Sequence, residues 1–269
     1  MTRTTLGRGL VLAASLLIVA CNANSAPSVL TDPKEILKAA AANAATATSF
    51  HLDLTADGTL NLDLTGTGVG STPIKLTGTT AAGDIDVAGK ATKLTFAIPG
   101  LLGLAGEVIV KDGTAYYKTT LTGALYKKQS AANAPTPSVD PSAVPKMLAT
   151  LDEFLAKPGV DPAKGADVDC GGKTCSTVTI QLTPAELAAL NGGSANVPVP
   201  SALPIPVPLN LTGASVDLSF RVERDTNRLA GAAATLGFAD GGKLTTDITF
   251  SNWNAPVAIS APAADQVAP

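Results

Sequence analysis

The sequence has little of the chemistry that enzymes use. Its 269 residues include one histidine, and neither a Gly-x-Ser-x-Gly nucleophile elbow nor a phosphate-binding P-loop occurs among them. A Ser-His-Asp site would have to use that histidine, His51. His51 alternates with Phe50 and Leu52, so on a strand it falls on the face opposite these apolar side chains. We therefore predict no enzymatic activity, no catalytic residue and no cofactor.

Charged and metal-binding residues are also scarce. Charged residues make up 15% of the chain, and the formal net charge is −3. Nucleic-acid-binding proteins need a basic stripe, which this balance does not provide, so we expect no nucleic-acid partner. A structural zinc site needs four ligands. One histidine and the pair Cys170 and Cys175 fall short of that number, so the sequence predicts no metal site.

The first 20 residues have the order of a secretory signal. Arg3 and Arg8 precede an apolar run at 10–19, and small Ala20 follows it. The run is too short to cross a bilayer, which takes about 20 apolar residues, and no second long apolar run follows. Removal of residues 1–20 would take the formal net charge to −5, because both arginines and no acidic residue would be lost.

Residues 18–21, Ile-Val-Ala-Cys, resemble the lipobox of bacterial lipoproteins. The resemblance implies diacylglycerol on the thiol of Cys21, cleavage before Cys21 and acylation of the new N-terminus. One acyl chain binds a membrane marginally and two or more hold it durably, so such an anchor would be stable. We therefore expect a protein attached by lipid to the extracytoplasmic side of the cell membrane. The alternative is an ordinary secretory signal with a cysteine near its cleavage site.

Cys170 and Cys175 enclose a Gly-Gly pair and, after export, would lie in an oxidising compartment. A disulfide across the Gly-Gly turn is expected there, and two free thiols are the alternative. Because the loop is so short, its closure would stabilise the fold only modestly.

The periodicity predicts one α+β domain built mainly of antiparallel strands. Apolar residues recur at helical spacing in three segments, 34–46, 146–156 and 185–190. Through most of the remaining chain they alternate with polar residues, which predicts about ten strands with one wet face. Asp-Gly pairs at 57–58, 112–113 and 240–241 predict turns between strands.

Composition also indicates where the domain begins and ends. The domain is assigned to 31–260, after a small polar tether at 21–30 and before a flexible tail at 261–269, and 257–259 could add a last strand. Residues 197–208 alternate apolar residues with proline, which cannot donate to a sheet, so they predict an extended flap over the body.

Several local sequences together resemble one family. After the lipobox and an alanine-rich helical segment come Thr-Ser-Phe-His at 48–51, Val-Ile-Val-Lys-Asp-Gly-Thr-Ala-Tyr-Tyr at 108–117, Val-Asp-Pro at 139–141 and Ser-Asn-Trp-Asn at 251–254. This order resembles the mycobacterial-type LppX/LprAFG lipoproteins over nearly the whole chain after residue 20. The resemblance implies a strongly curved antiparallel sheet, a half-barrel like that of the LolA/LolB lipoprotein carriers, with helices packed on its concave face and a cavity between. It also implies binding of lipids or acylated glycolipids and their transfer through the envelope.

A sheet of this size presents more apolar surface than three short helices can cover. Exposed apolar patches beyond a few hundred Å² are uncommon on soluble monomers. Either the sheet closes on itself and buries its own side chains, or hydrocarbon from outside covers it. The family resemblance favours a cavity, and the low aromatic content, 4%, suits an interior left partly unfilled. The residues expected to line the cavity are Phe50, Leu52, Leu54, Phe96, Ile98, Val108, Val110, Leu148, Leu151, Leu155, Val178, Ile180, Val216, Leu218 and Phe220.

The sequence thus predicts a monomeric envelope lipoprotein that binds lipids or acylated glycolipids and transports or presents them, with an envelope transporter as a candidate partner. The alternative is a lipid-anchored interaction or sensor module with a filled core. Lys127 and Lys128 beside Tyr126 could meet an anionic head group or the membrane surface, and a solvated loop is the simpler interpretation.

Overall fold

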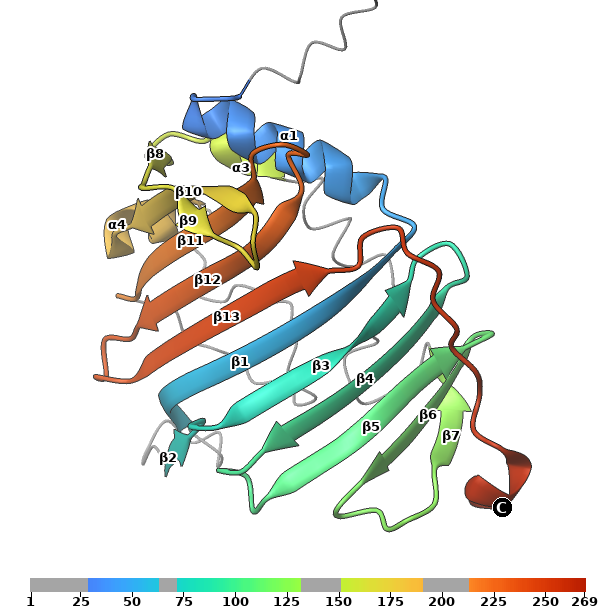
Figure 1. The fold of residues 1–269 in the computed structure, drawn as a ribbon. Coiled ribbons are helices and arrows are strands. Elements are labelled where there is room, and N and C mark those ends of the chain that lie inside the picture. Colours follow the sequence, from blue (N-terminus) through green and yellow to red (C-terminus); the bar gives the residue numbers. More distant parts are fainter. Residues whose placement is uncertain (1–28, 63–71, 132–150, 191–212) are drawn as a thin grey trace, which may run out of the picture.

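A computed structural model describes residues 29–62, 72–131, 151–190 and 213–269. These residues form a strand-rich α+β fold in which 13 antiparallel strands make one unclosed sheet (Figure 1). The strands are β1 (Ser49–Leu62), β2 (Thr72–Lys75), β3 (Thr79–Asp86), β4 (Ala91–Ile98), β5 (Leu104–Lys111), β6 (Thr114–Thr119), β7 (Lys127–Ser130), β8 (Ala163–Lys164), β9 (Val168–Asp169), β10 (Thr174–Leu182), β11 (Ser215–Glu223), β12 (Leu229–Gly237) and β13 (Lys243–Ser251). The described helices are α1 (Pro33–Ala45), α3 (Leu151–Leu155), α4 (Pro184–Leu190) and the short 3-10 helix η2 (Ala264–Gln266).

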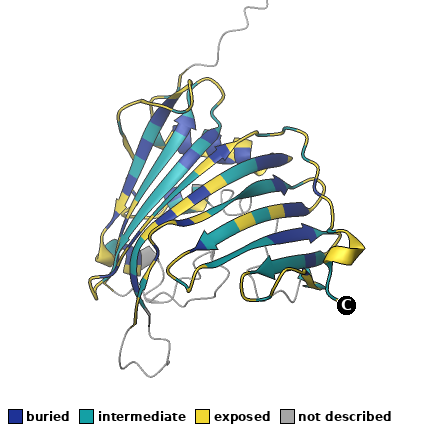
Figure 2. Cartoon of the chain, turned by 60° about the horizontal axis from the view of Figure 1, so that its bottom comes forward, coloured by how far each residue is buried: buried dark blue, intermediate teal, exposed yellow. Residues whose placement is uncertain are grey.

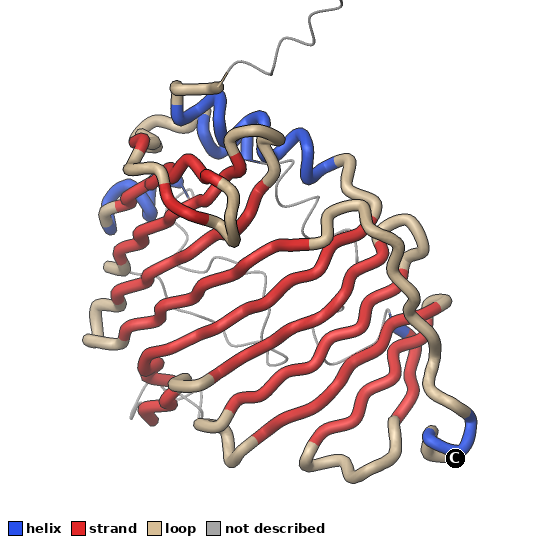
Figure 3. The backbone as a smooth tube through the Cα atoms, viewed as in Figure 1, coloured by secondary structure: helices blue, strands red, loops and turns tan. Residues whose placement is uncertain are grey.

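Two up-and-down ladders meet in the middle of the sheet. The strand order is β7-β6-β5-β4-β3-β1-β13-β12-β11-β10-β8, with β2 paired to β1 and β9 to β10. The early strands therefore occupy one half, the late strands occupy the other, and the β1–β13 pair joins them. Figure 2 shows the sheet bent into an open trough, and Figure 3 shows its long central strands running side by side. The expected number is about ten; four of the 13 strands, β2, β7, β8 and β9, are short, with two to four residues each.

Helix α1 begins where the sequence predicts. The side chain of Asp32 accepts hydrogen bonds from the backbone N of Lys34 (2.9 Å) and of Glu35 (3.0 Å), and Pro33 occupies the first helical turn. Its buried stripe is Ile36, Leu37, Ala40, Ala41 and Ala44. Among the described helices, none is long and apolar enough to cross a membrane.

The other two predicted helices correspond to α3 and α4, which are both short in the described residues. α4 agrees with the predicted segment 185–190, and Thr183 and Glu186 cap it reciprocally, since Thr183 N donates to Glu186 Oε2 at 2.8 Å. That hydrogen bond holds the pKa of the Glu186 carboxyl below its ordinary value. α3 covers the end of the predicted segment 146–156, of which 146–150 lie outside the described residues, as does the proline-rich 197–208.

β1 corrects one predicted turn. The pair Asp57 and Gly58 predicts a hairpin, but β1 runs unbroken as Ser49–Leu62. Its first part pairs with β3 and its last part with β2, while β13 pairs across the junction. Gly58 stands at this junction with a φ of +128°, and a Cβ there would collide with the backbone oxygen of Lys243. The glycine therefore bends a long strand closely against β13 instead of reversing it.

The C-terminal segment also differs from the prediction. Residues 257–259 form no strand, and 261–269 are not free. The backbone N of Tyr126 donates to the Gln266 carbonyl, and the backbone N of Ala268 donates to the Tyr126 carbonyl, both at 2.8 Å. These bonds hold the segment against the start of β7, an edge strand whose backbone groups would otherwise need other partners.

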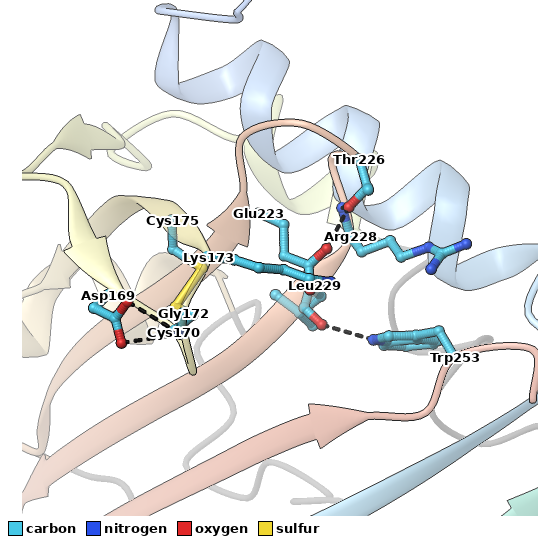
Figure 4. Close-up of polar contacts among 10 residues, drawn as sticks. All are labelled: Asp169, Cys170, Gly172, Lys173, Cys175, Glu223, Thr226, Arg228, Leu229 and Trp253. Carbon is cyan, nitrogen blue, oxygen red and sulfur yellow. Dashed lines mark hydrogen bonds and ion pairs between the residues drawn. A yellow bond between two sulfur atoms is a disulfide. The ribbon is translucent and has the colours of Figure 1, made fainter.

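The predicted disulfide is formed. Cys170 and Cys175 are bonded across the turn between β9 and β10, with their Cα atoms 6.0 Å apart (Figure 4). Lys173 in that turn forms an ion pair of 2.7 Å with Glu223 at the end of β11. Burial alone would raise the pKa of the Glu223 carboxyl, but hydrogen bonds from Lys173 and Thr226 outweigh burial and hold that pKa below its ordinary value. The disulfide hairpin is thereby tied to the turn between β11 and β12.

Candidate functional site

The strand register gathers the predicted lining residues on one face of the sheet. In β1 the pairs Phe50↔Ile85 and Leu52↔Phe250 fix which side chains share a face with Phe50, because paired residues point the same way. Successive pairs carry this face to β5 in one direction and to β10 in the other. We call it the apolar face. The predicted residues on it are Phe50, Leu52, Leu54, Phe96, Ile98, Val108, Val110, Val178, Ile180, Val216, Leu218 and Phe220.

The described helices pack on one end of the apolar face. α1 lies against β10, β11 and β12, and α4 lies against β10 and β11 (Figure 1). In the same cluster Val178 and Ile180 are 0% exposed, Leu155 of α3 is 2% exposed and Leu151 packs beside them. Leu148, the remaining predicted residue, lies outside the described residues. This end of the face is a filled core.

Three aromatic rings complete the packed end. Phe50 is fully buried, and its ring centroid lies 5.9 Å from that of Phe250 and 5.1 Å from that of Trp253. Trp253 Nε1 donates to the Leu229 carbonyl at 3.0 Å, so its one polar atom is satisfied (Figure 4). Strand alternation misses Trp253 because the residue lies beyond the end of β13.

Away from the helices, the apolar face keeps partly exposed side chains. Leu94 and Phe96 of β4 and Leu104 of β5 are half-buried. The apolar clusters around Leu54 and Val108, which cover this region, contain no residue of a described helix. The partly exposed positions run along several strands of the trough (Figure 2).

Small residues occupy the middle of the apolar face. They are Ala81 and Gly83 in β3, Gly106 in β5, and Ala232 and Ala234 in β12. The ring of Phe96 lies over Gly106, since a Cβ there would be 2.9 Å from Phe96 Cζ. A Cβ at Gly83 would likewise be 2.8 Å from Leu94 Cδ2, so the two glycines let Leu94 and Phe96 lie close against the sheet. Hydrophobic alternation identifies Phe96 but passes over its small neighbours, because these carry a weak signal.

Charged groups pair on the opposite, polar face. His51 Nδ1 lies 2.7 Å from Asp84 Oδ1, and His51 Nε2 lies 3.4 Å from Asp53 Oδ2. Arg221 binds both carboxylate oxygens of Asp247, at 2.7 and 2.8 Å, and these hydrogen bonds raise the pKa of its guanidinium. His51 therefore points away from the apolar face, as the alternation predicts. Within the described ranges, no three His, Cys, Asp or Glu side chains form a group suited to a metal ion.

A hollow beside the start of α1 is too small to hold an acyl chain. It is lined by residues including Leu30, Ile36, Val222 and Asn227, and its empty volume is ≈ 170 Å³ including open solvent. Sites for small molecules usually measure about 300–1,000 Å³. The candidate site is therefore the apolar face beyond the helices.

Sequence comparison finds no matching family model and no significantly similar curated protein, whereas the fold resembles solved structures. LprF from Mycobacterium bovis is 18% identical, with 86% of this chain and 97% of LprF covered and a TM-score of 0.52. LppX from Mycobacterium tuberculosis is 13% identical, with 85% and 98% covered and a TM-score of 0.48. A LolA-superfamily protein from Nitrosomonas europaea is 8% identical, with 85% and 96% covered and a TM-score of 0.27.

Of these likenesses, the one to LprF carries weight, and it extends over nearly the full length of both chains. It agrees with the resemblance that the local motifs indicate, and that resemblance is confirmed at the level of the fold. The strand-rich, unclosed antiparallel sheet with its short helices is the fold that LprF also has.

Proposed function

We propose that the chain is a lipoprotein of the cell envelope that binds acyl chains of lipids or acylated glycolipids and transports or presents them, without catalysing a reaction. In this proposal the apolar face is the concave face of the sheet, and sheet and helices enclose a cavity. Residues 31–260 form one lipid-binding domain. Cys21 carries the lipid anchor outside the cytoplasm, after residues 1–20 are removed, and 21–30 form the tether. A lipid supplier or acceptor, such as an envelope transporter, is the partner, and the protein acts as a monomer.

The observation that supports lipid binding is the partly exposed apolar surface of β3, β4 and β5, where small residues alternate with Leu94 and Phe96. Each methylene moved there from water contributes about 0.8 kcal/mol. Ten methylenes would thus contribute on the order of 8 kcal/mol before the costs of binding, without a fixed polar group. Such a site needs no charged residue, and the ion pairs of His51 and Arg221 lie on the other face.

The test is the lipid content of the purified protein. Organic extraction and mass spectrometry should recover an acyl lipid in a fixed ratio to the protein. Leu94→Gln should lower that ratio because Leu94 is half-buried on the apolar face. Thr95→Gln is the matched control, since Thr95 is the next residue, exposed on the polar face. Thermal unfolding of both variants would separate loss of lipid from loss of fold.

Two results would contradict the proposal. One is wild-type protein that repeatedly yields no lipid and takes up no fluorescent fatty acid. The other is equal lipid content in Leu94→Gln and Thr95→Gln, because the lipid would then lie elsewhere. Persistent absence of lipid would favour the alternative, a lipid-anchored interaction module with a filled core.

A further inference from the structure

Two loops at one end of the sheet expose leucines. In the turn between β4 and β5, Leu102 is 95% exposed. In the loop between β6 and β7, Leu121 is 70% exposed and Leu125 is 43% exposed. We call the segments 99–103 and 120–125 the leucine tips. Large apolar side chains this exposed gain nothing from the protein's own core.

The leucine tips lie next to each other. Thr120 N donates to the Ala105 carbonyl at 2.8 Å, and Ala105 N lies 3.3 Å from Thr120 Oγ1. Leu121 directly follows Thr120, and Leu102 stands three residues before Ala105. Figure 3 shows both loops along the lower edge of the sheet, at the end opposite α1. The exposed leucines therefore form one projecting group at the edge of the trough.

The backbone at Leu102 is strained, although its side chain is not part of the core. Leu102 has a φ of +54° and Gly103 a φ of +68°. A positive φ strains a leucine and leaves a glycine unstrained, so glycine would suit the turn better at both positions. A strained residue whose side chain contacts mainly solvent is expected to serve something outside the chain.

The charges beside the leucine tips are mainly basic. Lys127 and Lys128 of β7 follow Leu125 by two and three residues, and both are exposed. Neither 99–106 nor 119–130 contains an aspartate or a glutamate. Two carboxylates lie nearby: Glu107 of β5 accepts a hydrogen bond from the Tyr126 hydroxyl and pairs with Lys93 and Lys118, and Asp265 stands two positions from the residue that bridges to Tyr126. Projecting apolar side chains beside exposed lysines match the layering of a membrane surface, with hydrocarbon beneath anionic head groups.

We propose that the leucine tips insert into the surface of an anionic bilayer, as a membrane contact separate from any anchor at Cys21. Three leucines on two narrow loops suit penetration between lipids, whereas a stable protein interface needs a broad complementary area. This inference does not depend on the proposed lipid cargo. Insertion would place the bilayer at the edge of the trough, and an acyl chain would pass across this edge between the bilayer and the apolar face.

The test is vesicle binding by the chain that begins at Asn22. This chain lacks Cys21 and keeps every described element, all of which lie within 29–269. Co-sedimentation with phosphatidylglycerol-phosphatidylcholine vesicles should exceed that with phosphatidylcholine alone. Leu102→Gly and Leu121→Ser should each lower binding about tenfold, the effect of withdrawing one partly buried leucine. The double variant Lys127→Gln and Lys128→Gln should remove the preference for the anionic lipid.

The controls separate insertion from folding and from other partners. Leu102→Gly should unfold in urea at the same or a higher concentration, because it relieves the positive φ. Val168→Ser removes a 39% exposed apolar residue on β9 and should leave binding unchanged. Equal binding by wild type and tip variants would overturn the proposal, as would self-association without vesicles that Leu102→Gly abolishes. Co-purified lipid is measured separately, so its absence would count against the proposed cargo and not against insertion.

Discussion

Replacing two phenylalanines on the same face of the sheet should give very different losses of stability. Phe50 and Phe96 both lie on the apolar face, but Phe50 is 0% exposed under the α1 end, whereas Phe96 is half-buried beyond it. We expect Phe50→Ala to lower the free energy of unfolding by about 4 kcal/mol, since the change leaves a cavity among well-packed neighbours. Phe96→Ala should lower it by about 1–2 kcal/mol, because less area leaves water there on folding.

The measurement is urea unfolding of lipid-free protein. Trp253 is the chain's single tryptophan and packs 5.1 Å from Phe50, so its fluorescence reports the loss of the packed end. Phe96→Ala should clearly lower the ratio of bound lipid to protein, although it lowers stability only a little. If Phe96→Ala costs as much stability as Phe50→Ala, β4 belongs to a closed core and the reasoning about an open half is refuted.

Three further changes test the fold around the site. Gly58→Ala should destabilise the protein by more than about 1 kcal/mol in urea, because a side chain at positive φ would be forced against β13, and a neutral result would contradict the bend assigned to β1. Joint replacement of Cys170 and Cys175 by serine should lower the free energy of unfolding by about 2 kcal/mol, as expected for so short a loop. Reductant should abolish this difference between wild type and variant. The lowered pKa of Glu223 stabilises the fold above the carboxyl's ordinary value of about 4.3, and this contribution disappears as pH falls through the lowered value. Melting from pH 7 to pH 2 should therefore fall less steeply for Glu223→Gln, and an unchanged acid limb would exclude the ion pair with Lys173 as its cause.

Alternation of apolar and polar residues predicts the sheet well, because each strand has one dry and one wet face. β10, β11 and β13 are such strands, and their apolar residues share one face. The disulfide is predicted from another local pattern, two cysteines five positions apart around a Gly-Gly pair in a chain expected to be exported. Both features are predicted by local sequence patterns because the interactions that determine them involve residues close together in the chain.

The misjudged elements depend on tertiary neighbours. An Asp-Gly pair usually reverses a chain, but at Gly58 the pairing of β13 across the junction keeps the strand going. The C-terminal residues have tail-like composition, yet Tyr126 supplies backbone partners for Gln266 and Ala268 from far along the chain. Trp253 joins the core from beyond a strand end for the same reason. Distant partners of this kind leave no periodic trace in the sequence.

The hydrogen bonds of α1 bear on which part of the molecule can adapt to a ligand. Asn43 near the end of the helix donates to the carbonyl oxygens of Thr226 and Asn227, at 3.2 and 3.0 Å, and Asp32 caps its start. Lifting α1 would break the two hydrogen bonds of Asn43, at a net cost of about 1 kcal/mol each, and would expose the fully buried Leu37 as well. If the proposed lipid binds over β3–β5, α1 need not move, because no described helix residue belongs to the apolar clusters there. For the proposed lipid binding, we therefore expect the lipid to enter from the side of the leucine tips, away from α1.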